Sequence, residues 1–301
     1  MTITFHISNT VRMLFKAGIL VLTLCVGSFA LPLKNGTQNV NSTVEEDLSI
    51  YFIHADPSVR IVGGTPAAQT PHMVALVTGT QVRSLLCGAS IITNRHVLTA
   101  AHCLDAVRSG HILLSSLRGI VGSIHFASGG LQLTFSRSVI HGDYWPEPVL
   151  KNDLAILTTS LTIPLSNAVR IININYDWVG AGVATYVTGW GRTFNGGPVS
   201  QVLLRLDALS IDGNRCRQDV ARRAAELNMR GIPTVDPNLE VCTFHSHGRG
   251  MCHGDSGSAL VRSDRNEQIG ITSWALPCAN GAPDVFVRLS TYRNWIERNA
   301  R

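Results

Sequence analysis

Alternating or β-branched apolar segments, separated by glycine-rich turns, dominate the chain after residue 60. Examples are Ile112–Leu114, Leu131–Phe135 and Ala184–Thr188, and such segments are typical of antiparallel strands. Two stretches have a helical pattern instead, one from Asp212 to about Asn228 and one from about 290 to 299. The pattern predicts an all-β fold with a C-terminal helix.

The first 30 residues have a different pattern. Arg12 and Lys16 precede an apolar run, Ala17–Ala30, which has small residues at its end and stops before Pro32. This arrangement is typical of a signal peptide, which we predict over residues 1–30. A membrane helix is the alternative, but the run is short for one. No other stretch is long and apolar enough to span, so we expect a secreted protein without a membrane segment.

Residues 31–60 are polar, include an acidic cluster at 45–47 and contain no cysteine. Two sequons begin at Asn35 and Asn41, where exposure on a secreted segment would allow glycosylation. We interpret this stretch as a pro-segment. Because it has no cysteine, it cannot stay attached by a disulfide after cleavage.

Composition limits the possible partners. Without residues 1–60, about 240 residues remain, enough for one large all-β domain. A formal net charge of +5 would suit nucleic acid, but no binding motif accompanies it, so we expect no such partner. After Arg60 the chain has twenty arginines and one lysine, Lys151. Arginine stays charged far above the pH at which lysine titrates, which favours an alkaline environment, with compositional drift as the alternative.

The chain contains seven cysteines, of which Cys25 lies in the predicted signal peptide. The other six are an even number in a secreted chain, which predicts disulfides. A metal site is the rival interpretation, but no Cys-x-x-Cys pair occurs, so we expect neither a metal nor another cofactor. The connectivity does not follow from the sequence alone.

Three short motifs carry candidate chemistry. Ser256 lies in a glycine-rich stretch directly after Asp255. A serine hydroxyl is a weak nucleophile until a base takes its proton. His102, in the stretch Thr99–Cys103, is a candidate base, and Asp153, at the start of an apolar strand, is a candidate group to orient it. Together the three predict nucleophilic catalysis by serine.

On these motifs, the chain from about Ile61 to its end resembles the trypsin/chymotrypsin-like serine endopeptidases. The resemblance implies two packed antiparallel six-stranded β-barrels, at about 61–175 and about 176–288, with a C-terminal helix at about 290–299. It implies a monomer that hydrolyses peptide bonds of protein substrates through an acyl-enzyme, needs no cofactor and is controlled by protein protease inhibitors.

The resemblance also assigns roles to single residues. Gly254 and Ser256 would form the oxyanion hole. Ser273 would support the triad aspartate, and Trp274 and Ala275 would pair with the substrate backbone. The implied disulfides are Cys87–Cys103, Cys216–Cys242 and Cys252–Cys278.

The sequence Arg60-Ile-Val-Gly-Gly resembles an activation boundary. The resemblance implies that a trypsin-like protease cuts after Arg60 and that the freed ammonium of Ile61 pairs with Asp255. A buried carboxylate needs such a partner. A strand end followed by a turn is the simpler alternative for Ile-Val-Gly-Gly.

Counting back from Ser256 places Gly250 at the base of the implied specificity pocket, with Asp284 on the opposite wall. Glycine leaves a deep pocket for a large apolar side chain, whereas the carboxylate of Asp284 would accept a basic one. Alternatively, Asp284 caps a turn. This combination resembles the chymotrypsin-like and collagenolytic digestive proteases of insects and crustaceans. We expect cleavage after Phe, Tyr or Leu, with Ala275 narrowing the entrance and Arg or Lys as secondary choices.

Two functional classes remain open, a digestive endopeptidase of broad use and a regulatory cascade protease with a narrow substrate. The lack of a cysteine-rich module upstream favours digestion, and a complete triad disfavours an inactive binding homologue. The predicted helix near residue 212 carries a basic cluster, either a solvated face or an exosite for acidic substrates: Arg215, Arg217, Arg222 and Arg223.

Overall fold

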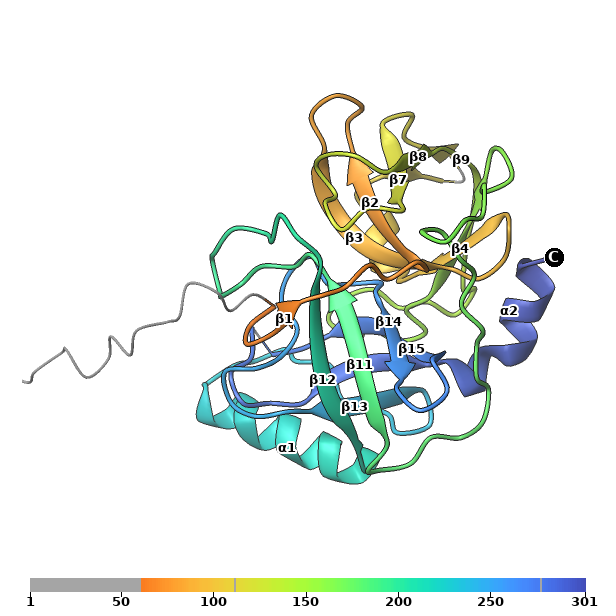
Figure 1. Cartoon of the computed structure of the whole chain (residues 1–301). Helices are drawn as coiled ribbons and strands as arrows, with labels where there is room; N and C mark the ends of the chain where they lie inside the picture. The colour runs from red at the N-terminus through yellow and green to blue at the C-terminus, as the bar shows by residue number, and fades with distance from the viewer. Residues whose placement is uncertain (1–60, 111, 277) are drawn as a thin grey trace, which may run out of the picture. The chain divides into compact units, whose positions relative to one another are not determined.

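The computed structural model describes residues 61–301, apart from His111 and Pro277. The predicted signal peptide, the pro-segment with its two sequons, and Arg60 lie outside the described residues. Within the described range, no helix combines the length and apolarity that membrane crossing requires. Two antiparallel sheets make up most of the fold (Figure 1).

The sheet of the C-terminal half closes into a ring of six strands, because β13 pairs with β12 as well as with β16. β1 (Thr65–Pro66) pairs with β12 from outside the ring. In order around the ring, the strands are β12 (Leu204–Ile211), β11 (Ala184–Gly189), β14 (Ala259–Arg262), β15 (Glu267–Trp274), β16 (Asp284–Arg288) and β13 (Glu240–Phe244).

The sheet of the N-terminal half has seven strands, and a separate short hairpin consists of β5 (Arg108–Ser109) and β6 (Ile112–Leu113). The order in the sheet is β8 (Leu131–Leu133), β7 (Leu117–Val121), β2 (Met73–Thr78), β3 (Ser84–Ile91), β4 (His96–Thr99), β10 (Ala155–Thr159) and β9 (Phe135–Ile140).

Strands β8 and β9 are the two edges of that sheet, yet only Thr134 separates them in the chain. They are two parts of one strand, of which the first pairs with β7 and the second with β10. This strand, which is interrupted at Thr134, connects the two edges of the sheet. Six strands therefore surround the N-terminal core. The expected all-β fold with two six-stranded barrels is confirmed in this form.

Strand β2 explains how the barrels pack. Its side chains alternate between two faces, as in any strand. Val74 and Leu76 belong to the N-terminal core. Met73, Ala75 and Val77 face the other way, into a cluster that includes Trp190 and Leu203 of the C-terminal half. Both faces of β2 are therefore buried, which is why its sequence is apolar throughout.

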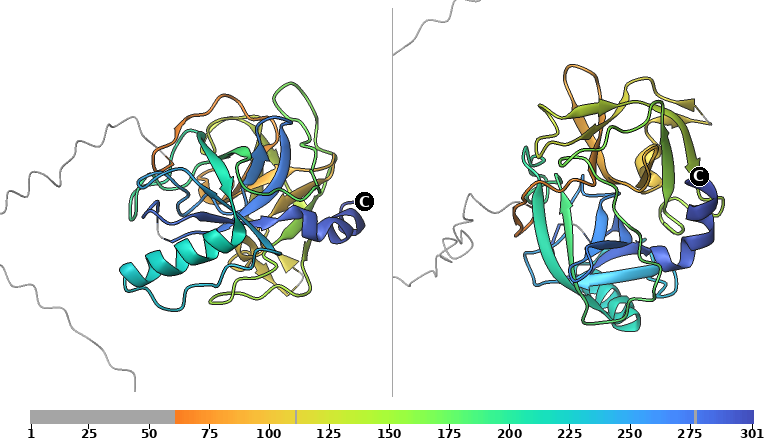
Figure 2. Two further views of the ribbon diagram at one scale, coloured as in Figure 1. Left: turned by 90° about the horizontal axis from the view of Figure 1, so that it is seen from below. Right: turned by 45° about the vertical axis from the view of Figure 1, so that its right-hand side comes forward.

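The two helices confirm the helical patterns. Asp212 caps α1 (Gly213–Glu226) by accepting a hydrogen bond from the backbone N–H of Arg215, a favourable arrangement for an N-terminus. α2 (Arg293–Asn299) follows a 3₁₀ turn, η3 (Leu289–Tyr292). Its buried Ile296 packs into the N-terminal core, and Figure 2 shows α2 beside that barrel. The end of the chain thus braces the first barrel.

Three disulfides staple the fold, and they are the pairs that the resemblance implies. Cys87–Cys103 ties β3 to the turn after β4, Cys216–Cys242 ties α1 to β13, and Cys252–Cys278 spans two loops near the C-terminal barrel. Each bridge restricts the unfolded chain more than the folded one.

Removal of Cys216–Cys242 should lower the free energy of unfolding by about 3 kcal/mol, since its 26-residue separation leaves a long loop open in the unfolded chain. The variant is Cys216→Ala/Cys242→Ala, made with Ser256→Ala to prevent self-digestion. Urea unfolding of this protein and of Ser256→Ala alone measures the difference. Equal midpoints and slopes would contradict the prediction.

Candidate active site

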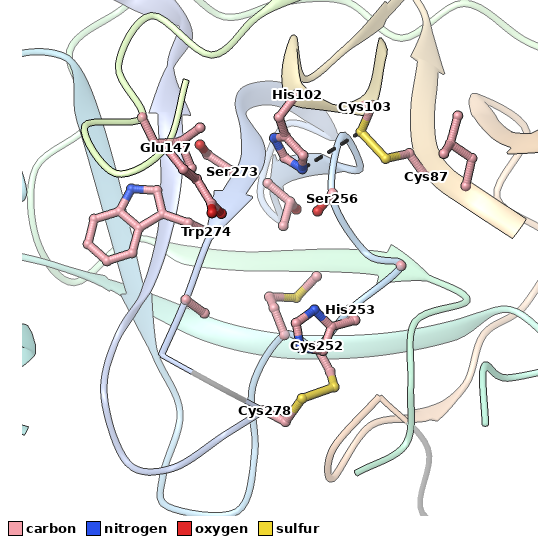
Figure 3. Close-up of a pocket in the computed structure, with 16 residues that line it drawn as sticks. Cys87, His102, Cys103, Glu147, Cys252, His253, Ser256, Ser273, Trp274 and Cys278 are labelled. Atoms are coloured by element: carbon pink, nitrogen blue, oxygen red, sulfur yellow. Dashed lines mark hydrogen bonds between the residues drawn. A yellow bond between two sulfur atoms is a disulfide. The ribbon is translucent and has the colours of Figure 1, made fainter. Parts of the chain in front are cut away.

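His102 lies just after strand β4 of the N-terminal barrel. Strand β4 ends at Thr99, and the short turn η2 (His102–Leu104) follows. The disulfide of Cys103 with Cys87 anchors this turn to β3. The histidine side chain keeps 26% of its surface exposed, and it faces the cleft in which Ser256 also lies (Figure 3).

Asp153 is buried behind His102 and accepts three hydrogen bonds. Its Oδ1 accepts from the backbone N–H of His102 at 2.9 Å. Its Oδ2 accepts from Nδ1 of His102 at 2.8 Å and from the hydroxyl of Ser273 at 2.6 Å. Because an ionised carboxylate only accepts, the ring proton resides on Nδ1 and Nε2 remains the basic nitrogen.

Two opposing effects act on the pKa of His102. Burial lowers this pKa, because desolvation disfavours the imidazolium ion. The charge of Asp153 and the hydrogen bond to it raise the pKa, as do the charges of Asp105 and Glu147, and the net shift is upward. The site therefore stabilises His102 once it has taken a proton.

Ser256 stands in a turn that only glycines allow. Gly254 and Gly257 have φ values of 101° and 80°, in the left-handed region that favours glycine. A side chain at Gly257 would collide with Thr99 and with the carbonyl oxygen of Gly88. The turn holds Ser256 at the cleft, and its carbonyl accepts a hydrogen bond of 2.8 Å from Gly88.

The cleft has a volume of about 400 Å³ and receives residues from both barrels. Within the described part of the chain, the backbone N–H groups of Gly254 and Ser256 donate to no protein acceptor. They are thus available to a bound oxygen atom. The cleft is lined by Leu86, Cys87, His102, Cys103, Glu147, Leu150, Met251, Cys252, His253, Gly254, Ser256, Thr272, Ser273, Trp274, Ala275 and Cys278.

Asp255 points away from the cleft and is completely buried. Burial raises its pKa to about 7, although hydrogen bonds from the N–H groups of Gly191 and Cys252 act in the opposite direction. Ile61 is also fully buried, in the core of the C-terminal barrel. The next residue, Val62, accepts a hydrogen bond of 3.1 Å from the N–H of Gly250.

Gly250 and Asp284 lie next to each other, as expected, but neither is among the residues that line the cleft. Both carboxylate oxygens of Asp284 accept from the N–H of Met251, each at 3.1 Å, and Met251 itself lines the cleft. Burial raises the pKa of Asp284 to about 7, the Met251 hydrogen bond lowers it, and the charge of Asp255 raises it.

Ser273, Trp274 and Ala275 all line the cleft. The indole of Trp274 donates to Glu240 at 2.9 Å, and the ammonium of Lys151 donates to the same oxygen, also at 2.9 Å. Glu240 is almost fully buried, and desolvation raises its pKa despite these donors and the charge of Lys151. This network joins the segment before Asp153 to the wall of the cleft.

Several residues at the site have no role that was predicted from the sequence. Leu150 and Glu147 line the cleft on the loop before Asp153, and Glu240 lies behind Trp274. The short distance in sequence between Glu147 and Asp153 is a signal that could have placed Glu147 near His102, to which Asp153 is bonded. Glu240 gave no comparable signal, because its partners lie far away in the chain.

The basic cluster on α1 is largely neutralised by acids on the same helix. Arg215 and Arg222 pair with Asp219, and Arg222 and Arg223 pair with Glu226. Paired charges on an exposed helix face favour the solvated-face interpretation over an exosite for acidic substrates.

Known proteins are similar in sequence to the part of the chain that forms this site. The chain matches the Trypsin family over residues 61–296. It is 34% identical to "Serine protease SP24D" of Anopheles gambiae over 80% of this chain and 82% of that protein. It is 34% identical to "Trypsin, alkaline B" of Manduca sexta, covering 84% of this chain and 95% of that protein. With "Chymotrypsin" of Phaedon cochleariae the identity is 29%, over 95% and 98% of the two chains.

The match covers both barrels and every residue of the cleft described above. The chain therefore belongs to the trypsin family and is a serine endopeptidase.

Proposed function

We propose that the protein is the secreted zymogen of a digestive endopeptidase in which Ser256, His102 and Asp153 form the catalytic triad. The observation that carries this proposal is the hydrogen-bonded chain from Ser273 through Asp153 to His102, which ends at the cleft that contains Ser256. A regulatory cascade protease with a narrow substrate is the second candidate.

Acylation starts when Nε2 of His102 takes the proton of the Ser256 hydroxyl and the oxygen attacks the scissile carbonyl carbon. The serine oxygen–carbon bond forms, and His102 then gives its proton to the leaving amine as the peptide bond breaks. A water molecule then attacks the acyl-enzyme in the same way, with His102 again transferring the proton, and the carboxylic acid is released as Ser256 regains its hydrogen. Asp153 keeps the Nδ1 proton in place and stabilises the imidazolium, in agreement with the raised pKa of His102.

The N–H groups of Gly254 and Ser256 would stabilise the negative charge on the carbonyl oxygen during the attack. Both are without an acceptor in the described structure, and donors fixed in advance at such a place contribute a few kcal/mol each. Trp274 and Ala275 would bind the substrate backbone as an added strand.

Activation would follow cleavage after Arg60 by a trypsin-like protease. The buried Asp255 has two backbone donors but no cationic partner among the described residues, and burial raises its pKa. The ammonium freed at Ile61 would supply that cation. Since Asp255 adjoins both N–H donors of the oxyanion hole, the pairing would also fix their direction.

For the residue before the scissile bond we propose a large apolar side chain. Met251, Ala275 and the Cys252–Cys278 disulfide line the cleft, whereas the carboxylate of Asp284 is held behind Met251. Trypsin-like cleavage through Asp284 is the alternative, and relatives named trypsin and relatives named chymotrypsin both occur. Three relatives carry the name alkaline trypsin, which supports action in an alkaline gut lumen.

Peptide hydrolysis should fall by at least about four powers of ten in Ser256→Ala and in His102→Ala, because each removes an essential partner in proton transfer. Ser273→Ala should cost far less, since Asp153 keeps both bonds to His102. Steady-state kcat/KM of the three activated variants measures this order. Near-normal turnover in either of the first two would refute the triad.

Arg60→Gln should give a protein that stays intact and inactive when treated with trypsin. It should also be less stable at about pH 8 than at about pH 5, because a raised folded-state pKa of Asp255 means that stability present at low pH is lost as the pH rises from about 4 through about 7. Cleavage should reduce this loss by supplying a cation.

Thermal unfolding of Arg60→Gln and of cleaved Ser256→Ala across this pH range tests the difference. Asp284 is present in both proteins and its pKa depends on the charge of Asp255, so the comparison isolates the effect of the new cation on these two buried carboxyls. Identical pH profiles would exclude the Ile61–Asp255 pair, and full activity in uncleaved protein would exclude the zymogen.

Among matched substrates that carry Phe, Leu or Arg directly before the scissile bond, those with Phe or Leu should have the higher kcat/KM. If the charge of Asp284 contacts the substrate, the Arg-to-Phe ratio of kcat/KM should instead rise as the pH passes about 7, where that carboxyl ionises. We expect a ratio that is constant with pH and unchanged in Asp284→Gly. A tenfold preference for Arg that is lost in this variant would establish the trypsin-like alternative.

A further inference from the structure

Glu147 is the only carboxylate among the described residues that line the cleft. It is exposed, and the described residues provide it with neither a hydrogen bond nor an ion pair. The acids that flank it in the fold differ in this respect, because Asp105 accepts from the hydroxyl of Tyr144 and Asp153 is fully bonded. An unpaired carboxylate that faces a substrate cleft is free to bind a cationic group.

The loop that carries Glu147, residues 144–151, is held at both ends. Trp145 and Lys151 exchange backbone hydrogen bonds of 3.0 and 3.1 Å. Leu150 is buried against the cluster that includes Trp274, and Lys151 is paired with buried Glu240. The position of Glu147 over the cleft is therefore set by the C-terminal barrel as well as by its own loop.

Glu147 lies on the side of His102 that faces Ser273 and Trp274, opposite the Cys87–Cys103 disulfide (Figure 3). A substrate that adds a strand along Trp274 and Ala275 places the residues before its scissile bond on this side. Successive side chains of an extended strand point in opposite directions. If the first side chain before the scissile bond enters the pocket beside Cys252–Cys278, the second and fourth point toward the 144–151 loop.

We propose that Glu147 forms an acidic subsite that selects substrates with a basic side chain, Arg or Lys, at the second or fourth residue before the scissile bond. The proposal rests on the endopeptidase function proposed above. It adds an electrostatic preference that is separate from the pocket for the residue before the scissile bond. An arginine at this position would reach a carboxylate that has no competing partner, in a cleft whose other described lining residues include no Arg or Lys.

The test uses activated protein and peptides with one fixed residue before the scissile bond. Arg is compared with citrulline, its neutral isostere, at the second, third and fourth residues before that bond. At low salt, wild type should prefer Arg by about fivefold in kcat/KM at the second or the fourth position, the range of a partly exposed ion pair. At the third position the ratio should stay near one.

Glu147→Gln should bring the ratio to about one, and Glu147→Lys should reverse it. Asp143→Asn is the matched control, because Asp143 is an exposed carboxylate near the same loop that does not line the cleft. This control should keep the wild-type ratio. Raising the salt to about 0.5 M should weaken the preference of wild type, since screening shortens the reach of charge.

Hydrolysis of the citrulline peptides tests the endopeptidase function by itself. If they are cleaved but wild type shows no preference for Arg, or if Glu147→Gln keeps the preference, the subsite is refuted and the endopeptidase stands. If activated wild type cleaves none of the peptides while the Ser256→Ala control behaves identically, both proposals fall together.

Discussion

The site depends on the hydrogen bonds of Asp153, because this buried carboxylate needs donors from both barrels. It leads into β10 of the N-terminal barrel and binds His102 twice, while Ser273, at the end of β15 in the C-terminal barrel, supplies the third donor. A carboxylate 1% exposed is costly without such partners. Any shift of one barrel against the other would break the bond to Ser273, so the hydrogen bonds of Asp153 link barrel packing to the orientation of His102.

The other buried carboxylates near the cleft have different sets of partners. Glu240 has Lys151 as a cation and Trp274 as a further donor, and these contacts make it a structural link. Asp255 and Asp284 have backbone donors only, and burial raises the pKa of each to about 7. A buried carboxyl without a cation either keeps its proton or costs stability, so these two are the places where a new positive charge would have the largest effect.

Sequence reasoning succeeded where the signal is local. Ser256 in its glycine-rich stretch, the histidine beside Cys103 and the helical stretch that starts at Asp212 each show in a short segment of the chain. It failed where partners are distant. Nothing near Glu240 in the chain indicates Lys151 or Trp274, and the break at Thr134 that makes β8 and β9 separate strands depends on pairing with β7 and β10. The carboxylate of Asp284 was expected at the pocket, but only the fold shows the N–H of Met251 beside it.

Burial also decides how strongly each acid near the cleft can influence substrate choice. Glu147 is exposed, so leaving it unpaired costs little, and a cation beside it gains at most about 1 kcal/mol. Asp284 is buried, and a basic side chain that reached it would remove a penalty of several kcal/mol. Glu147 can therefore only adjust a preference, whereas Asp284 would dominate it if a substrate could reach past Met251. Under the proposed function, the larger effect on specificity would therefore come from access to Asp284, which is bonded to the N–H of Met251 and does not line the cleft.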